Sequence, residues 1–165
     1  MRSKLLTALV ALLLLSEFKT DTNDTITVFM IGDSTMANKP LSGGNQERGW
    51  GQMLPGFFTE NVRVDNHAQN GRSSKSFINE KRWDAVLAKI RKGDYVFIQF
   101  GHNDEKEGEK RHTDPGTTFD ENLRKFVNET RSKGGIPVLF NAIVRRNFGE
   151  NKNAVAEDDL HGKGT

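Results

Sequence analysis

Apolar residues recur along the chain in short runs whose spacing distinguishes strands from helices. Two continuous runs, Ile26 to Ile31 and Tyr95 to Phe100, predict strands that are buried on both faces, as in a parallel sheet. An alternating stretch from Val62 to Ala68 and a later run from Pro137 to Val144 predict two more strands.

Three stretches between these strands carry apolar side chains at helical intervals of three and four residues. They contain Trp50, Met53, Leu54, Phe57 and Phe58; Trp83, Val86, Leu87 and Ile90; and Phe119, Leu123, Phe126, Val127 and Thr130. Alternation of strand and helix specifies right-handed crossovers and a mainly parallel sheet. The fold predicted is therefore a three-layer α/β/α sandwich.

A polar turn follows each of the first three predicted strands. The first is Gly32-Asp33-Ser34-Thr35, the second runs from Gln69 to Ser74, and the third is Gly101-His102-Asn103-Asp104. Ligands of such sheets bind beyond the carboxyl ends of the strands. We therefore expect Ser34, Gly71 and Asn103 to lie at one edge of the sheet.

The two ends of the chain differ from its middle. Arg2 and Lys4 precede an apolar run, Leu5 to Leu15, which has the length of a signal peptide and is too short to span a bilayer. We predict a signal peptide over residues 1–20, a domain over 25–148 and a polar loop or tail over 149–165. The predicted product is exported, periplasmic or secreted, and not held in a membrane once the signal is removed.

Composition excludes several classes of function. The formal net charge is only +2, which gives no electrostatic reason to bind nucleic acid. There is no cysteine, so disulfides and thiolate chemistry are excluded. No grouping of His, Asp and Glu has metal-ligand spacing, and no phosphate-binding glycine loop is present, so we expect neither a metal nor a cofactor.

Ser34 is the candidate nucleophile. A sharp turn directly after a buried strand lifts its hydroxyl above the sheet edge, and Asp33 and Thr35 are suited to holding that turn by local hydrogen bonds. The alternative is that Ser34 caps the following helix, which is a common use of serine in this position. For an isolated Gly-Asp-Ser the capping role would be favoured.

The three turns together resemble the first three sequence blocks of the SGNH (GDSL-like) hydrolases. Within that superfamily, the segments Asp33 to Ala37, Arg48 to Gln52 and Gln99 to Asp104 resemble the rhamnogalacturonan acetylesterase group, which removes acetyl groups from pectic polysaccharide. The resemblance implies that Ser34 attacks the ester. It also implies that the backbone N–H groups of Ser34 and Gly71 and the side-chain amide of Asn103 stabilise the oxyanion.

The resemblance further implies an Asp-x-x-His block that completes the catalytic triad. Asp158-Asp159-Leu160-His161 has this pattern. However, the polar stretch that separates it from the fourth predicted strand is too short for a further crossover helix and strand. Our expectation is that the last strand, the last helices and the family's own block are missing, and that Asp158 and His161 lie in a variable loop.

Substrate contacts are less well defined. His102 and Trp50 are candidates for lining a sugar site, and Arg72 is a candidate for binding a galacturonate carboxylate. The alternatives are a packing role for His102, a core position for Trp50 and a solvated surface position for Arg72. The predicted partner is an acetylated polysaccharide; a lipid or thioester substrate and an inactive carbohydrate-binding fragment remain as rival interpretations.

Overall fold

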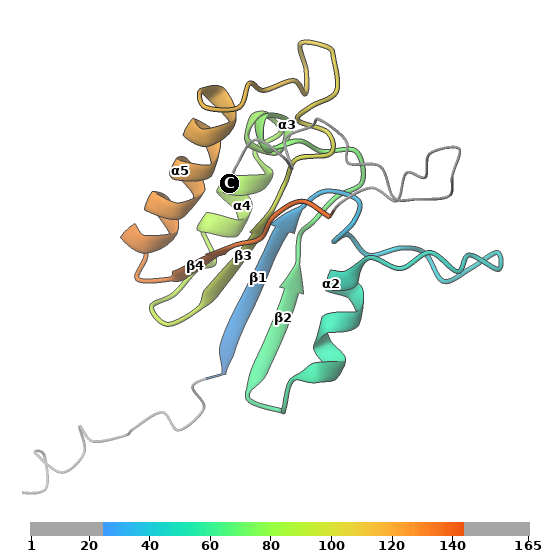
Figure 1. Cartoon of the computed structure of the whole chain (residues 1–165). Coiled ribbons are helices and arrows are strands. Elements are labelled where there is room, and N and C mark those ends of the chain that lie inside the picture. Colours follow the sequence, from blue (N-terminus) through green and yellow to red (C-terminus); the bar gives the residue numbers. More distant parts are fainter. Residues whose placement is uncertain (1–24, 144–165) are drawn as a thin grey trace, which may run out of the picture.

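The computed structural model describes residues 25–143, which form one sheet and its flanking helices (Figure 1). The strands are β1 (Ile26–Gly32), β2 (Val62–Asn66), β3 (Tyr95–Gln99) and β4 (Ile136–Leu139). They lie in the order β2-β1-β3-β4, and each neighbouring pair is parallel. The predicted parallel α/β fold is confirmed.

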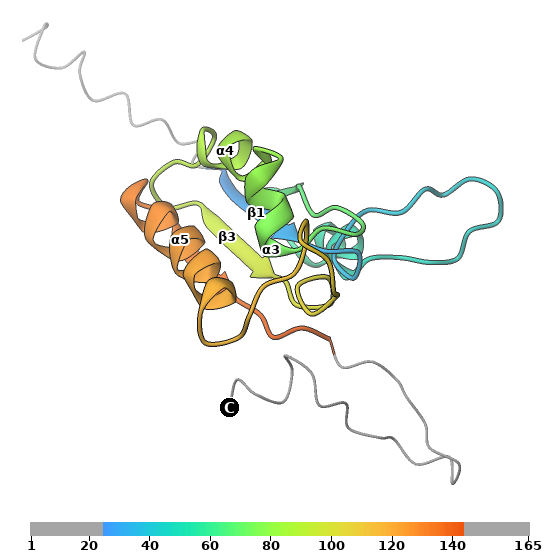
Figure 2. The same cartoon turned by 90° about the horizontal axis from the view of Figure 1, so that it is seen from above.

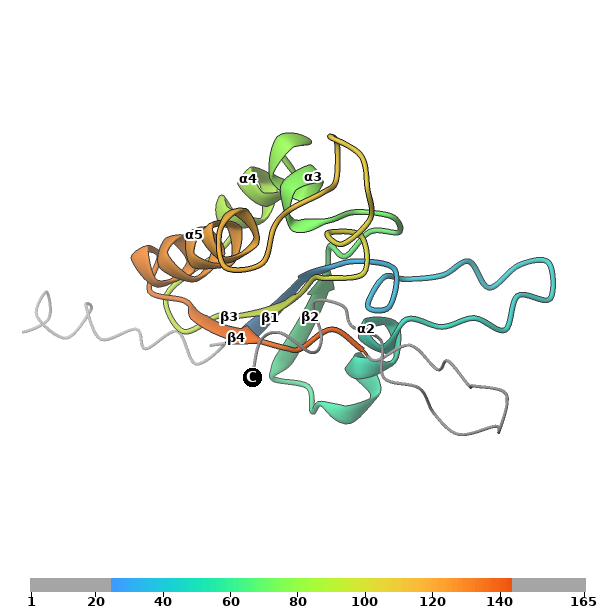
Figure 3. The ribbon, with the colours of Figure 1, turned by 45° about the horizontal axis from the view of Figure 1, so that its top comes forward.

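Helices cover both faces of this sheet unequally. Figures 1 and 3 show α3 (Ser74–Asn79), α4 (Arg82–Leu87) and α5 (Thr118–Ser132) on one face, and α2 (Trp50–Met53) on the other. A 3₁₀ helix, η1 (Leu54–Phe57), continues α2. In Figure 2 the loop between β1 and α2 extends away from the sheet.

The core has two parts, one on each face of β1. Phe29 and Ile31 pack with the α3, α4 and α5 side, where Trp83 and Phe126 are fully buried. Val28 and Met30 pack on the α2 side with Met36 and Ala37. Because successive side chains of a strand point to opposite faces, burial on both sides explains why β1 is continuously apolar.

Several predicted elements are shorter than expected, and the helix after β1 and strand β4 are the clearest examples. The helical stretch after β1 holds only one α-helical turn before η1, which has Pro55 in its first turn, and Phe57 is 82% exposed. Proline lacks the N–H that would continue the α-helical bonding. β4 ends at Leu139, before the expected Val144. The helical spacing therefore predicted too long a helix after β1, and the apolar run predicted too long a fourth strand.

Helix α3 was not predicted. It begins with a reciprocal cap, in which the Ser76 N–H donates to Ser73 Oγ (3.1 Å) and the Ser73 N–H donates to Ser76 Oγ (2.9 Å). The helix is only 6 residues long, which is too short to show an apolar period. Its detectable signal is this pair of serines three residues apart.

A pair of glycines brings α2 close to the turn after β1. A Cβ atom at Gly49 would lie 2.0 Å from the carbonyl oxygen of Ala37, and one at Gly51 would lie 2.6 Å from that of Met36. The Trp50 N–H donates to the Thr35 carbonyl oxygen (2.9 Å). The segment around Trp50 therefore packs against the turn that carries Ser34 and stabilises it.

The predicted signal peptide and the predicted tail, residues 149–165, lie outside the described residues. Within residues 25–143, no helix is both long and apolar enough to cross a membrane.

Candidate active site

The three turns predicted from the sequence lie at the carboxyl ends of three adjacent strands. Ser34 follows the central strand β1, Gly71 follows β2 on one side, and Asn103 follows β3 on the other. The Gln69 N–H donates to the Gly32 carbonyl oxygen (3.0 Å), which ties the second turn to the end of β1. Sheet topology thus places all three candidate residues along the same edge.

The buried carboxylate of Asp33 stabilises the turn that carries Ser34 through hydrogen bonds with Thr35. Asp33 is 1% exposed, and its Oδ1 accepts from the Thr35 N–H (2.9 Å) and lies 2.8 Å from the Thr35 hydroxyl oxygen. Ser34 itself is half-buried. The next helix, α2, has Gly49 at its N-cap and no side-chain cap, so Ser34 does not serve as that cap.

Gly71 occupies a backbone conformation that favours glycine. Its φ is +75°, and no atom would lie within 4 Å of a Cβ atom placed on it. Its N–H has no hydrogen-bond acceptor among residues 25–143, and the same is true of the Ser34 N–H. These two backbone donors, one of which belongs to the candidate nucleophile, are therefore unpaired within the described part of the chain.

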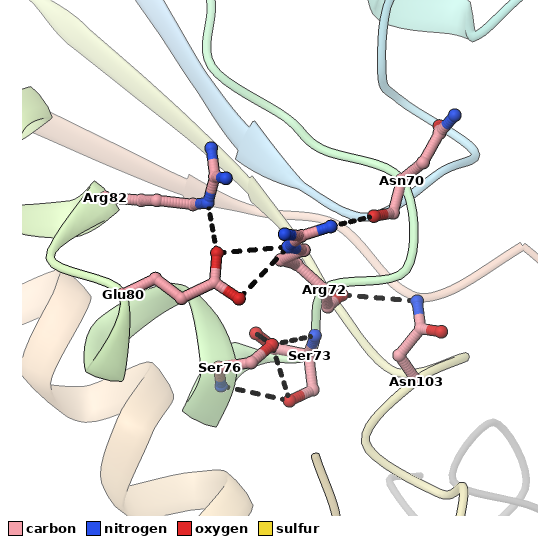
Figure 4. Close-up of polar contacts among 7 residues, drawn as sticks. All are labelled: Asn70, Arg72, Ser73, Ser76, Glu80, Arg82 and Asn103. Carbon is pink, nitrogen blue, oxygen red and sulfur yellow. Dashed lines mark hydrogen bonds and ion pairs between the residues drawn. The ribbon is translucent and has the colours of Figure 1, made fainter. Parts of the chain in front are cut away.

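Asn103 is buried, with 2% exposure, and its orientation is fixed by the neighbouring turn. Its Nδ2 donates to the Arg72 carbonyl oxygen (3.2 Å), as Figure 4 shows. A primary amide has two N–H bonds. One hydrogen holds the side chain in place, and the second has no acceptor among residues 25–143.

Asp104, in the third turn, is hydrogen-bonded to Ser74 in the second turn. Sequence analysis did not assign Asp104 a role. It is fully buried, and its Oδ1 accepts from the Ser74 N–H (2.9 Å), the Ser74 hydroxyl (2.5 Å) and the Thr113 hydroxyl (3.0 Å). Burial raises the pKa of this carboxyl to about 6; these hydrogen bonds oppose the rise, and the nearby Asp33 charge adds to it. Its signal in the sequence was only its place beside Asn103.

We expect the Asp104→Asn variant to gain stability relative to the parent as the pH rises from about 4 to 8. The pKa of Asp104 in the folded state, about 6, lies above its ordinary value of 3.8. This carboxyl therefore contributes fully to stability below about pH 4, and the contribution is lost as the pH rises through 6. The change in the stability difference is about 3 kcal/mol.

Urea unfolding of parent and variant at several pH values checks this, because the other carboxyl groups cancel in the difference. A stability difference that stays constant between pH 4 and 8 would contradict the assignment.

The three candidate substrate contacts all have partners within the protein. His102 Nε2 lies 2.6 Å from the Ile143 carbonyl oxygen, and the Trp50 indole N–H donates to Gln99 Oε1 (2.7 Å). Arg72 donates through Nε to both carboxylate oxygens of Glu80, at 3.2 and 3.1 Å. Their predicted contacts with substrate stay predictions.

The base that would deprotonate Ser34 is not assigned within residues 25–143. His67 pairs with Asp65 (3.1 Å) and His112 with Asp114 (3.2 Å). The sequence candidates Asp158 and His161 lie outside the described residues. In the described part of the chain, no group of three or more His, Asp or Glu residues is arranged to hold a metal ion.

A pocket opens elsewhere, between the loop after β3 and the start of α5. None of Ser34, Gly71 and Asn103 lines it, so this pocket is not the candidate site. The lining residues are Lys75, Glu107, Gly108, Glu109, His112, Thr113, Asp114, Thr118, Glu121 and Asn122.

Comparison with known proteins decides the family. The model of the GDSL-like lipase/acylhydrolase family matches residues 30–161, which include all three turns. The chain belongs to this family. The predicted resemblance to SGNH hydrolases, and to their rhamnogalacturonan acetylesterase-like group, is confirmed.

Two curated relatives of this GDSL-like chain come from Bacillus subtilis (strain 168). It is 44% identical to the rhamnogalacturonan acetylesterase RhgT over 126 residues, which are 76% of this chain and 53% of RhgT. It is 36% identical to the probable rhamnogalacturonan acetylesterase YesY over 122 residues, 73% of this chain and 55% of YesY. The chain thus spans about half the length of these relatives.

The fold agrees with a solved structure from the same organism. The crystal structure of the Bacillus subtilis protein YxiM superimposes with a TM-score of 0.67 at 28% identity. The match covers 83% of this chain and 38% of YxiM.

Proposed function

We propose that this chain is a serine ester hydrolase that removes acetyl groups from a pectic polysaccharide such as rhamnogalacturonan. One observation carries the proposal. The Ser34 N–H, the Gly71 N–H and the second amide hydrogen of Asn103 stand at one sheet edge, and neither backbone group has an acceptor among residues 25–143. Unpaired donors at the same sheet edge as a half-buried serine suit a reaction that develops negative charge on oxygen.

In this mechanism the Ser34 hydroxyl oxygen attacks the acetyl carbonyl carbon while a base takes its proton. The carbonyl oxygen becomes negative, and the three donors stabilise it by roughly 3 kcal/mol each. Collapse of this intermediate releases the sugar hydroxyl, which receives the proton, and leaves acetyl-Ser34. Water then releases acetate through the same oxyanion site and restores the serine. His161 remains the sequence candidate for the base, with Asp158 as the carboxylate that would orient it.

Two observations support a sugar ester as substrate. RhgT and YesY, which carry rhamnogalacturonan acetylesterase in their names, are 44% and 36% identical to this chain. The loop from β1 to α2 beside the site is polar and exposed along most of its length. The proposal includes export from the cell, which rests on the predicted signal peptide.

The test measures the carboxylic acid that the purified chain releases. The acid is acetate from acetylated rhamnogalacturonan and from the acetylated xylan control, and butyrate from the tributyrin control. We expect release from rhamnogalacturonan to exceed release from either control. An organophosphate that mimics the tetrahedral intermediate should label the peptide containing Ser34, as mass spectrometry would show. Preference for tributyrin would replace the sugar ester with a lipid ester, and absence of both labelling and acetate release would remove the enzymatic proposal.

A further inference from the structure

Hydrogen bonds hold several peptide groups of the turn that contains Gly71. The Arg72 N–H donates to the Gln69 carbonyl oxygen (3.3 Å), and the Arg72 carbonyl oxygen accepts from Asn103. The following N–H, of Ser73, donates to Ser76 Oγ (2.9 Å) at the start of α3. None of these hydrogen bonds uses the Gly71 N–H, which has no acceptor among the described residues.

The guanidinium of Arg72 is hydrogen-bonded to the peptide group between Asn70 and Gly71, which contains this N–H. Its Nη1 donates to the carbonyl oxygen of Asn70 (2.9 Å), so the side chain folds back onto its own turn (Figure 4). A trans peptide is planar, and its C=O and N–H point in opposite directions. A donor that holds the Asn70 carbonyl on one side therefore directs the Gly71 N–H to the other.

Glu80 holds the guanidinium in the position that this requires. Both of its carboxylate oxygens accept from Arg72 Nε, and Arg82 Nε also donates to this carboxylate (2.6 Å). The hydrogen bond from Arg82 lowers the pKa of Glu80, and the contacts with Arg72 lower it further, so the carboxylate stays ionised. Arg72 therefore has one defined orientation between Glu80 and Asn70.

We propose that Arg72 is a positioning residue that sets the direction of the Gly71 N–H in the oxyanion site, with Glu80 orienting Arg72. This inference rests on the proposed function and gives Arg72 a role other than binding a substrate carboxylate. The side chains of Arg72 and Glu80 are 32% and 37% exposed. Ion pairs at that exposure contribute little to stability. This ion pair instead fixes the orientation of the Arg72 side chain.

The test compares Arg72→Gln and Arg72→Lys with Arg82→Gln. Arg82→Gln removes the other guanidinium from Glu80 but leaves the contact with Asn70 intact. We expect Arg72→Gln to lower kcat for 4-nitrophenyl acetate by roughly 10- to 100-fold with KM nearly unchanged, because a displaced donor loses most of its effect on the transition state. Arg72→Lys should fall nearly as far, since an ammonium cannot make both contacts. Arg82→Gln should stay within about threefold of the parent.

A second measurement does not depend on activity. In ¹⁵N relaxation of the full chain, the Gly71 amide should be rigid in the parent, with an order parameter near 0.85, and should fall below about 0.6 in Arg72→Gln. An unchanged Gly71 amide would overturn the inference, and so would an unchanged kcat in an active enzyme. If the parent shows no Ser34-dependent hydrolysis, the proposed function fails, while the amide data still decide whether Arg72 orders Gly71.

Discussion

The Ser34→Ala variant is expected to lose essentially all ester hydrolysis, with kcat/KM for 4-nitrophenyl acetate at least about 10³-fold below that of the parent. Alanine removes the only atom of this residue that can form the acetyl-enzyme. Ser34 is half-buried in a turn held by Asp33 and Thr35, and its hydroxyl has no hydrogen-bond partner among residues 25–143, so the fold should tolerate the change. Release of 4-nitrophenol at saturating and subsaturating ester measures the effect.

Ser42→Ala is the matched control. Ser42 is exposed in the loop between β1 and α2, and its backbone carbonyl, not its hydroxyl, accepts from Asn45 (3.4 Å). This variant should hydrolyse the ester at the parental rate. Equal rates for the parent and Ser34→Ala, with both folded by circular dichroism, would mean that Ser34 is not the nucleophile.

The second large effect is expected for Asn103→Ala, which removes the side-chain donor of the proposed oxyanion site. We expect kcat to fall by about 10²- to 10³-fold, because one such donor is worth roughly 3 to 4 kcal/mol in the transition state. KM should change little, since the donor binds the developing oxyanion more strongly than the neutral carbonyl. Steady-state kinetics with 4-nitrophenyl acetate separates these two constants.

Asn103→Asp sharpens this test. It keeps the shape of the side chain, but the carboxylate cannot donate and places a negative charge beside the oxyanion, so kcat should be lower still. Asn128→Ala, on the exposed side of α5, is the control and should retain parental kinetics. An Asn103→Ala enzyme with kcat within threefold of the parent would rule out this donor.

The elements that sequence analysis located best are those whose local pattern and final environment agree. Strand β1 is continuously apolar because helices cover both of its faces, and the period of α5 matches the single face that it buries. By contrast, the helical spacing after β1 predicted a longer helix than α2. Pro55 interrupts it, and Phe57 stays 82% exposed.

The candidate site was predictable to the extent that it depends on the ends of strands. Parallel strands that follow helices bring their carboxyl ends together, so Ser34, Gly71 and Asn103 were placed at one edge before any contact was known. Asp104 was missed, because its role depends on Ser74 and Thr113, which approach it from other segments. Its raised pKa likewise follows from complete burial, which a single polar position in a sequence does not reveal.

The sequence by itself determined the succession of strands and helices along the chain, the parallel arrangement of the strands, the glycine at the turn after β2 and the choice of the three candidate catalytic groups. Each of these depends on local periodicity or on a residue's own backbone preference. Only the tertiary structure decided how those groups are held. Folding brings Glu80 to Arg72, the side chain of Arg72 to the Asn70 carbonyl, and Asn103 to the Arg72 carbonyl. Such contacts join residues that are close in space because the chain has folded, and the direction of a hydrogen-bond donor is fixed only when they form.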